Sequence, residues 1–185
     1  MRIAAGQFKG KKITASSDLS IRPITNRLKE IIFSVLNDFF YDKKVLDLFS
    51  GSGSLGIEAL SRGAGHVTFV EKEESSIRVL NNNIDTLNID PKLMQIIKLD
   101  VLKFLIDSKN KYSLILSDPP FKYSSLQEMI NQIFTRNIIE PNGLLVLHHE
   151  IDNPLQIENV PYLLLKQKKI GRSLLSFVVK EETDV

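Results

Sequence analysis

The chain has 185 residues, 43% hydrophobic and 25% charged, with a formal net charge of +2, which is typical of one soluble globular domain. It contains no cysteine, and this excludes disulfides, thiolate metal sites and a cysteine nucleophile. No apolar run approaches the length of a membrane span, and the segment after Met1 lacks the apolar core of a signal peptide. A cytoplasmic location is therefore expected.

Basic side chains are concentrated at the N-terminal end. The first thirty residues contain seven Lys or Arg and two acids, a net charge of +5, whereas the remainder carries 17 basic and 20 acidic side chains, a net of −3. Gly6 and Gly10 separate short alternating segments, which predicts a small β-hairpin. We therefore expect residues 1–22 to form a basic arm for a polyanion, or alternatively a solvated hairpin, in front of a second unit, 23–185.

Strands alternate with helices from Lys44 onward. A helix capped by Thr25 or Asn26 comes first. Short apolar strands are predicted at 45–49, 67–70, 94–99, 112–116 and 144–147, separated by helices that end at 60, 87, 106 and 134. Such a pattern favours a parallel sheet covered by helices on both faces. The segments 162–167 and 174–179 have no helix between them, which predicts an antiparallel hairpin at one sheet edge.

Ligands of such sheets bind beyond the carboxyl ends of the strands, so the residues after each strand are the candidates for function. The first strand leads into Asp47 and then Ser50-Gly51-Ser52-Gly53-Ser54-Leu55-Gly56, a G-x-G-x-x-G spacing. Glycines there allow a tight turn and close approach of the backbone to a ligand. A tight turn without a ligand is the alternative interpretation.

Acids follow the second and third strands. Glu71 is placed to accept both hydroxyls of a ribose, although an acid favoured by a helix dipole is the alternative. Asp100 and Val101 are placed to hold an adenine ring, although taken singly Asp100 is better explained as a helix cap.

The fourth strand is followed by Asp118-Pro119-Pro120-Phe121, the most specific pattern in the chain. Two prolines stiffen the loop. Proline has no backbone N–H, so the first proline offers a carbonyl acceptor but no donor. A carboxylate, a rigid carbonyl and an aromatic ring then stand where a substrate would meet a cofactor. A stiff loop that only precedes a helix is the alternative.

These strand-end residues together resemble those of class I S-adenosylmethionine-dependent methyltransferases that act on amino groups. Four segments extend the resemblance to the bacterial RsmD family: RIAAGQFKGKK, RPITNR, DLFSGSGSLGIEALSRGA and DPPF. Members of that family methylate the N2 amine of a guanine in 16S ribosomal RNA. The resemblance runs from residue 2 to about 180, with departures at Ile24, Asn26 and Ser50, where the family usually has threonine, an acid and alanine.

The resemblance implies a Rossmann-like fold with a mostly parallel seven-stranded sheet, an antiparallel C-terminal hairpin and a small N-terminal β-hairpin extension. It implies 16S rRNA as partner, in an assembled or assembling small subunit, with no membrane partner; we expect a monomer without a metal. Expected roles are catalysis for Asp118, Pro119, Pro120 and Phe121, S-adenosylmethionine binding for Asp47, Ser50, Gly51, Gly53, Glu71, Asp100 and Val101, and RNA binding for Lys9, Lys11, Lys12, Arg22, Arg27 and Phe121.

Three other functions remain open at this point. A nicotinamide oxidoreductase shares the glycine loop and Glu71, and a DNA adenine or cytosine amino methyltransferase shares the chemistry of an exocyclic amine. A non-catalytic RNA-binding module is the third. His148 and His149 are expected to be ordinary core or surface residues, because neighbours on a strand point to opposite faces and cannot share one ion. Asn81-Asn82-Asn83 is expected to form the polar face of a helix.

Overall fold

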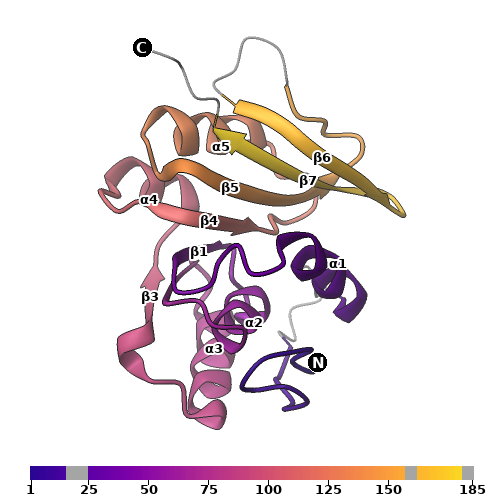
Figure 1. Cartoon of the computed structure of the whole chain (residues 1–185). Helices are drawn as coiled ribbons and strands as arrows, with labels where there is room; N and C mark the ends of the chain where they lie inside the picture. Colours follow the sequence, from indigo (N-terminus) through magenta and orange to yellow (C-terminus); the bar gives the residue numbers. More distant parts are fainter. Residues whose placement is uncertain (16–24, 157–161, 181–185) are drawn as a thin grey trace.

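A seven-stranded sheet runs through the computed structural model, which describes residues 1–15, 25–156 and 162–180 (Figure 1). Its strands are β1 Lys44–Leu48, β2 His66–Glu71, β3 Met94–Lys98, β4 Tyr112–Ser117, β5 Ile139–Glu150, β6 Tyr162–Ile170 and β7 Ser173–Lys180. The helices are α1 Asn26–Leu36, α2 Ser54–Ser61, α3 Glu74–Leu87, α4 Val101–Asp107 and α5 Leu126–Thr135, with a 3₁₀ turn, η1, at Pro91–Leu93.

The strand order is β3-β2-β1-β4-β5-β7-β6. The first five strands pair in parallel, and β7 pairs antiparallel with both β5 and β6. This confirms the predicted parallel sheet and the antiparallel hairpin at its edge. The hairpin strands are longer than expected, because Gly171 has a φ of +61° and completes a turn of only two residues with Arg172.

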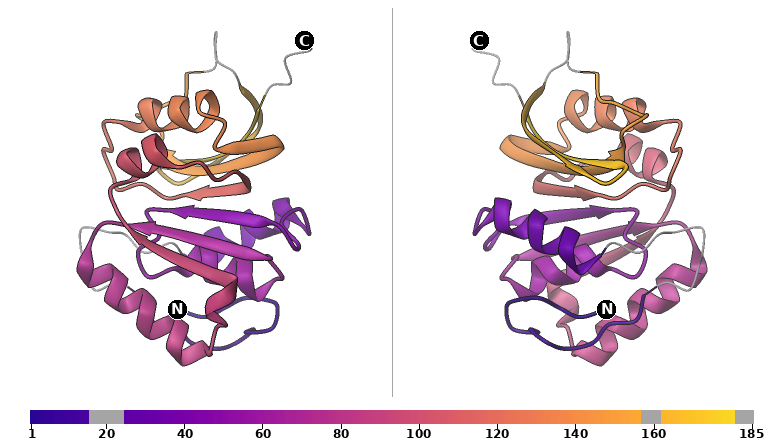
Figure 2. Two further views of the ribbon diagram at one scale, coloured as in Figure 1. Left: turned by 90° about the vertical axis from the view of Figure 1, so that its left-hand side faces the viewer. Right: turned by 90° about the vertical axis from the view of Figure 1, so that its right-hand side faces the viewer.

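Helices cover both faces of the sheet (Figure 2). Alternate residues of β1 show the two layers, since Val45 belongs to one hydrophobic core and Leu46 to the other. The first core contains the apolar side chains of α1, α2 and α3, and the second contains those of α4 and α5. This arrangement leaves the carboxyl ends of the parallel strands for a site. Among the described residues, no helix is long and apolar enough to cross a membrane.

The N-terminal segment folds back on itself through a single antiparallel bridge between Arg2 and Lys12. Ile3, Phe8 and Ile13 contribute to the first core, so the segment is packed against the rest of the chain. The last turn of α2 contacts it directly, because the carbonyl oxygen of Ser61 accepts the N–H of Gln7 at 2.7 Å and the hydroxyl of Ser61 accepts the N–H of Phe8 at 3.0 Å.

Gly6 makes this docking possible. It has a φ of +80°, and a Cβ atom there would lie 1.6 Å from the carbonyl oxygen of Ser61. No side chain fits such a gap, and the positive φ disfavours any other residue as well. The arm therefore reaches α2 only because position 6 is glycine.

A buried ion cluster holds α1, α2 and the arm together. Glu58 and Lys29 are both fully buried, with their side chains 3.3 Å apart, and Arg62 lies 2.9 Å from the other carboxylate oxygen of Glu58. The same carboxylate accepts the backbone N–H groups of Ala4 and Ala5 at 2.9 and 3.1 Å. Burial lowers the pKa of Lys29, and the nearby Glu58 opposes that shift.

Candidate active site

Three loops meet at the carboxyl ends of β1, β2 and β3. The N–H of Ser50 donates to the carbonyl of Val70 at 3.1 Å, and the N–H of Gly51 donates to the carboxylate of Glu71 at 2.8 Å. On the other side, the N–H of Leu99 donates to the carbonyl of Glu71 at 3.1 Å. The glycine loop, Glu71 and the segment leading to Asp100 therefore form one connected edge, as the sequence predicts.

Glycine is required in this loop for two physical reasons. Gly51 and Gly53 have φ values of +54° and +78°, a backbone region that side chains disfavour. Packing adds a second reason, since a Cβ on Gly53 would lie 2.3 Å from Cδ1 of Leu80. A Cβ on Gly56 would lie equally close to Cε1 of Phe69, so the first turn of α2 sits tightly against β2.

The Asp47 carboxylate lies beneath the loop. The side chain is 1% exposed, and Oδ2 accepts the N–H of Gly56 at 2.9 Å. Burial raises the pKa of Asp47 to about 8, and the nearby carboxylates of Asp118 and Glu71 add to the increase. A role in cofactor binding stays a prediction, because the carboxylate is buried and bonds to the backbone of the glycine loop.

The raised pKa of Asp47 predicts a pH-dependent stability. Between the unfolded value of 3.8 and about 8, the folded state binds the proton more tightly, so the free energy of unfolding falls as pH rises. We expect Asp47→Asn to remove this loss, on the order of 1.4 kcal/mol for each pH unit. Urea unfolding at pH 5 and pH 8 measures the difference, with the exposed Asp107→Asn as control. An equal pH response in Asp47→Asn and wild type would contradict it.

Glu71 is more engaged than the sequence suggests. Oε2 accepts the N–H of Gly51, while Oε1 accepts those of Lys72 and Glu73 at 2.8 and 2.9 Å. A carboxylate offers about four lone-pair directions, so about one remains for a ligand hydroxyl. Acceptance of two ribose hydroxyls would require Gly51 to release its bond.

Asp100 caps α4. Its Oδ1 accepts the N–H of Leu102 at 3.0 Å, which confirms the interpretation favoured for this residue taken singly. Val101 is 3% exposed and belongs to the second core. Their predicted contact with an adenine ring is not tested by this geometry.

The segment from Asp118 to Tyr123 is attached to the end of β5 and the turn after it at three points. His148 Nδ1 lies 2.7 Å from Oδ1 of Asp118, and these side chains are 18% and 22% exposed. Glu150 accepts the N–H of Lys122 at 2.6 Å, and Asn153 donates to the carbonyl of Tyr123 at 3.2 Å. The Asp-Pro-Pro-Phe loop is thus held by side chains more than twenty-five residues further along the chain.

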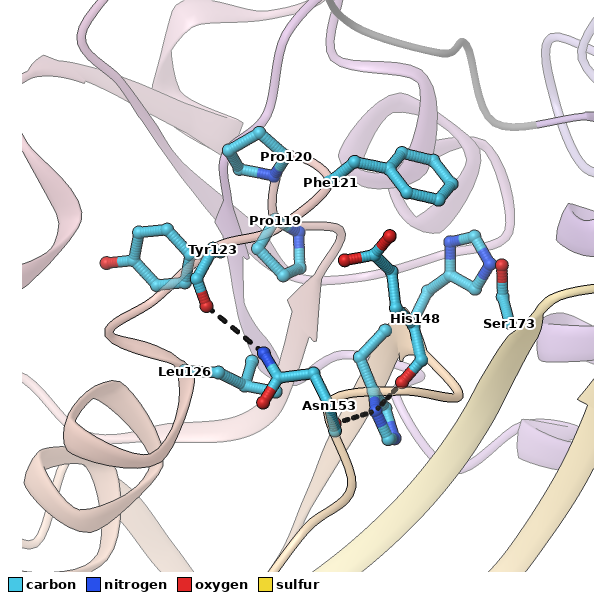
Figure 3. Close-up of a pocket in the computed structure, with 10 residues that line it drawn as sticks. Pro119, Pro120, Phe121, Tyr123, Leu126, His148, Asn153 and Ser173 are labelled. Carbon is cyan, nitrogen blue, oxygen red and sulfur yellow. Dashed lines mark hydrogen bonds between the residues drawn. The ribbon is translucent and has the colours of Figure 1, made fainter.

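A recess that is open to solvent lies beside this loop (Figure 3). It is lined by Pro119, Pro120, Phe121, Tyr123, Leu126, His148, His149, Glu150, Asn153 and Ser173. The Phe121 side chain is 44% exposed, an unusual position for a phenylalanine. Of the predicted site residues, Pro119, Pro120 and Phe121 face this recess.

Tyr123 links the recess to the glycine loop. Its ring packs edge-on against that of Phe49, with centroids 5.0 Å apart. Burial raises the pKa of Tyr123 to about 12, with smaller contributions from Asp100 and Glu128, so the hydroxyl stays neutral at physiological pH. The loops after β1 and β4 are therefore packed together.

Sequence patterns missed several of these contacts. His148 was expected to be an ordinary core or surface residue, but it pairs with Asp118. His149 is a core residue, as expected. Its Nε2 forms a hydrogen bond of 2.9 Å with the hydroxyl of Ser176 on β7, on the face of the sheet opposite to His148. Asn83 does not lie on a polar helix face, because it is 2% exposed and bonds Thr14 and Ser52. No local pattern marks these partners, which are distant in sequence.

Of the predicted RNA-binding residues, Phe121 lines the recess, whereas the basic ones that the structure describes do not. Lys9, Lys11 and Lys12 are exposed on the arm, and Lys11 lies 5.3 Å from the ring centroid of Phe8. Arg27 is exposed on α1, and Arg22 is outside the described residues. In the part of the chain that the structure describes, no group of three His, Asp or Glu side chains could hold a metal ion.

The sheet order, the antiparallel hairpin and the glycine loop are those of class I methyltransferases. The solved structure of yhhF from Escherichia coli superposes with a TM-score of 0.88 at 29% identity, covering 98% of both chains. A family model described as Conserved hypothetical protein 95 matches residues 1–179. The chain belongs to this family, the RsmD family.

Two relatives support the same assignment. A Haemophilus influenzae protein named Ribosomal RNA small subunit methyltransferase D is 35% identical over 173 residues, covering 92% of this chain and 89% of its own. The Escherichia coli protein of that name is 30% identical, covering 93% and 86%. A more distant structure, 16% identical with a TM-score of 0.70 and covering 84% of this chain and 50% of its own, was solved as a complex with SAH.

Proposed function

We propose that the chain transfers a methyl group from S-adenosylmethionine to the exocyclic N2 amine of a guanine in 16S rRNA. The observation that carries the proposal is the position of Asp118 and Pro119 directly after β4, which pairs with β1; Asp118 is paired with His148, and Pro119 lines the recess. Membership of the RsmD family and the names of the two relatives support ribosomal RNA as the substrate class.

The glycine loop and its neighbours fit the cofactor. A Cβ on Gly51 would meet no atom closer than the Phe49 carbonyl oxygen at 3.9 Å, so the glycine leaves open space there, and Ser50 would lie beside it. Glu71 keeps a lone pair for a ribose hydroxyl, while Asp100 and Val101 would flank the adenine. Asp47 would act from below, by fixing the N–H of Gly56. When bound, the cofactor supplies an electrophilic methyl on a sulfonium.

The chain's task is to orient the amine. A guanine amine is a weak nucleophile because its lone pair is delocalised into the ring. Hydrogen bonds from the amine to the Asp118 carboxylate and the Pro119 carbonyl would localise that pair and aim it at the methyl. Phe121 would stack on the base once it has left its own stack, and Pro120 would keep the loop stiff.

The RNA would contact more than the recess. We propose that the arm, residues 1–22, contributes phosphate contacts through Lys9, Lys11, Lys12 and Arg22, and that 23–185 forms the transferase unit. Arg27 would lie near the substrate entrance. A small subunit, assembled or assembling, is the expected substrate particle, bound by a monomer.

The other functions differ in their products or ligands. The chain has no cysteine for the thiolate attack used in carbon-5 pyrimidine methylation, which favours an amine. Adenine N6 and cytosine N4 are the remaining amines. A nicotinamide oxidoreductase would leave Asp118-Pro119 without a role.

Labelled methyl transfer tests the proposal. The chain would be incubated with S-adenosylmethionine labelled in the methyl group and with 16S rRNA or small subunits that lack the modification, followed by analysis of nucleosides. N2-methylguanosine is the expected product. Methylated adenosine or cytidine would overturn the guanine assignment, and absence of transfer to both RNA and particles would overturn the function.

His148 is expected to position Asp118. Its Nδ1 bonds the carboxylate, so His148→Ala would leave Asp118 free to rotate and would lower kcat about 10- to 100-fold, with an unchanged Kd for S-adenosylmethionine. His148→Asn keeps an N–H donor and should recover part of the rate. Equal losses in the two variants, or a weaker cofactor Kd, would contradict a positioning role.

A further inference from the structure

The β6–β7 hairpin carries basic side chains and no acidic one. Residues 162–180 contain five basic side chains, namely Lys166, Lys168, Lys169, Arg172 and Lys180, and no acid. The hairpin thus equals the first thirty residues in net charge, although the whole chain carries only +2. A surface of single sign on a nearly neutral protein indicates an anionic partner.

Three of these cations lie on the outer strand of the sheet. Lys166, Lys168 and Lys169 are exposed along β6, which is the last strand in the order, and Arg172 is exposed in the turn (Figure 1). The turn reaches the candidate site, because the N–H of Ile151 donates to the carbonyl of Arg172 at 3.2 Å and the adjacent Ser173 lines the recess.

The strand register connects the cations to Asp118. His148 pairs with Leu175 of β7, and Leu175 pairs with Lys168 of β6, so these three residues form one row across the sheet. Two strand spacings place Lys168 about 10 Å from His148. Directly paired residues share a face, so Lys168 and also Lys166, two positions away, lie on the face of His148. Lys169 pairs with Leu174 and lies on the opposite face with His149.

We propose that Lys166, Lys168 and Arg172 form a second RNA-binding surface, which holds phosphates of the nucleotides next to the target base. The inference rests on the proposed function, since it assigns the substrate's backbone to a surface continuous with that recess. The arm contacts the last turn of α2, whereas this hairpin borders the recess itself. Lysines also protect edge strands from aggregation, but that role makes no distinction between the two faces of β6.

The test compares RNA affinity among charge variants. The hairpin variant is Lys166→Gln/Lys168→Gln/Arg172→Gln. The control variant, Lys44→Gln/Lys109→Gln/Lys111→Gln, removes three exposed lysines near the amino ends of β1 and β4, away from the candidate site. The Kd for 16S rRNA or small subunits would be determined from 50 to 300 mM salt. The hairpin variant should bind roughly tenfold more weakly, with the slope of log K against log salt reduced by about 2.

Single variants refine the test. Lys168→Gln should lower the salt slope, and Lys169→Gln should change it much less. Unchanged S-adenosylmethionine affinity and circular dichroism would show that each variant is folded. If the wild type binds and methylates the RNA but the hairpin variant keeps the wild-type slope, the inference is wrong. If the wild type neither binds nor methylates, the proposed function fails and the inference falls with it.

Discussion

Asp118→Ala is expected to lower kcat for methyl transfer by about 10³-fold, while the Kd for S-adenosylmethionine stays within about twofold of wild type. The carboxylate is the acceptor that would localise the lone pair of the target amine, and its partner His148 lies 2.7 Å away on β5. Because the glycine loop bonds to Glu71 rather than to Asp118, removal of this side chain leaves the cofactor region intact. Single-turnover transfer to small subunits measures the rate, and equilibrium dialysis measures the Kd.

The control for this variant is a second acid from the same region. Asp152 is exposed in the turn after β5, so Asp152→Ala changes the charge by the same amount without touching the loop. Its rate should match wild type. Asp118→Asn keeps one carbonyl acceptor and should lose less than alanine. Near-normal turnover in Asp118→Ala would remove the basis of the mechanism.

Glu58→Gln is expected to lower the free energy of unfolding by about 3–5 kcal/mol, the typical effect of removing one partner from a buried ion pair. Glu58 is fully buried and accepts hydrogen bonds from Lys29, Arg62, Ala4 and Ala5. A neutral amide leaves the buried ammonium without its partner and meets two backbone N–H donors with a single oxygen. Chemical denaturation at pH 7 would measure the loss.

The matched control is an exposed pair of the same residue types. Glu74 bonds Lys98 at the surface, with both side chains more than half exposed, so Glu74→Gln should change stability little. The double variant Lys29→Met/Glu58→Gln should lose less than the sum of the single losses, since it removes both charges. Equal losses from Glu58→Gln and Glu74→Gln would argue against a structural role for the buried cluster.

Local sequence patterns were sufficient to predict the strands of the sheet and the loops at their carboxyl ends. The apolar runs that became β1, β2 and β4 are buried on both faces, so they lack polar alternation and cannot be mistaken for surface strands. Parallel strands bring their ends to one edge, which is why Ser50, Glu71, Asp100 and Asp118 were expected at the same edge; that they form one functional site stays a prediction.

Contacts between residues that are distant in the sequence could not be predicted from local patterns. β5 begins at Ile139, five residues before the expected start. The sequence did not predict this extension, because Pro141-Asn142-Gly143 has the composition of a turn. In the structure, the segment still pairs with β4, through a shift in the strand register. His148 and Asn83 are ordinary strand and helix residues by sequence. The partner of His148 depends on which strands are neighbours in the sheet, and the partner of Asn83 depends on where the arm docks. A short stretch of sequence determines neither the strand order nor the docking position.

The docking of the arm also has an evolutionary consequence. A Cβ at position 6 would collide with the backbone of Ser61, and Glu58 in the same helix bonds Ala4 and Ala5. Because the collision is with backbone atoms, no substitution at position 61 would relieve it, and position 6 is restricted to glycine as long as the arm docks in this way. Lys9, Lys11 and Lys12 face solvent and carry no such constraint. We therefore expect Gly6 and Glu58 to be retained together with the fold, whereas the three lysines are limited only by the anionic partner that we propose for the arm.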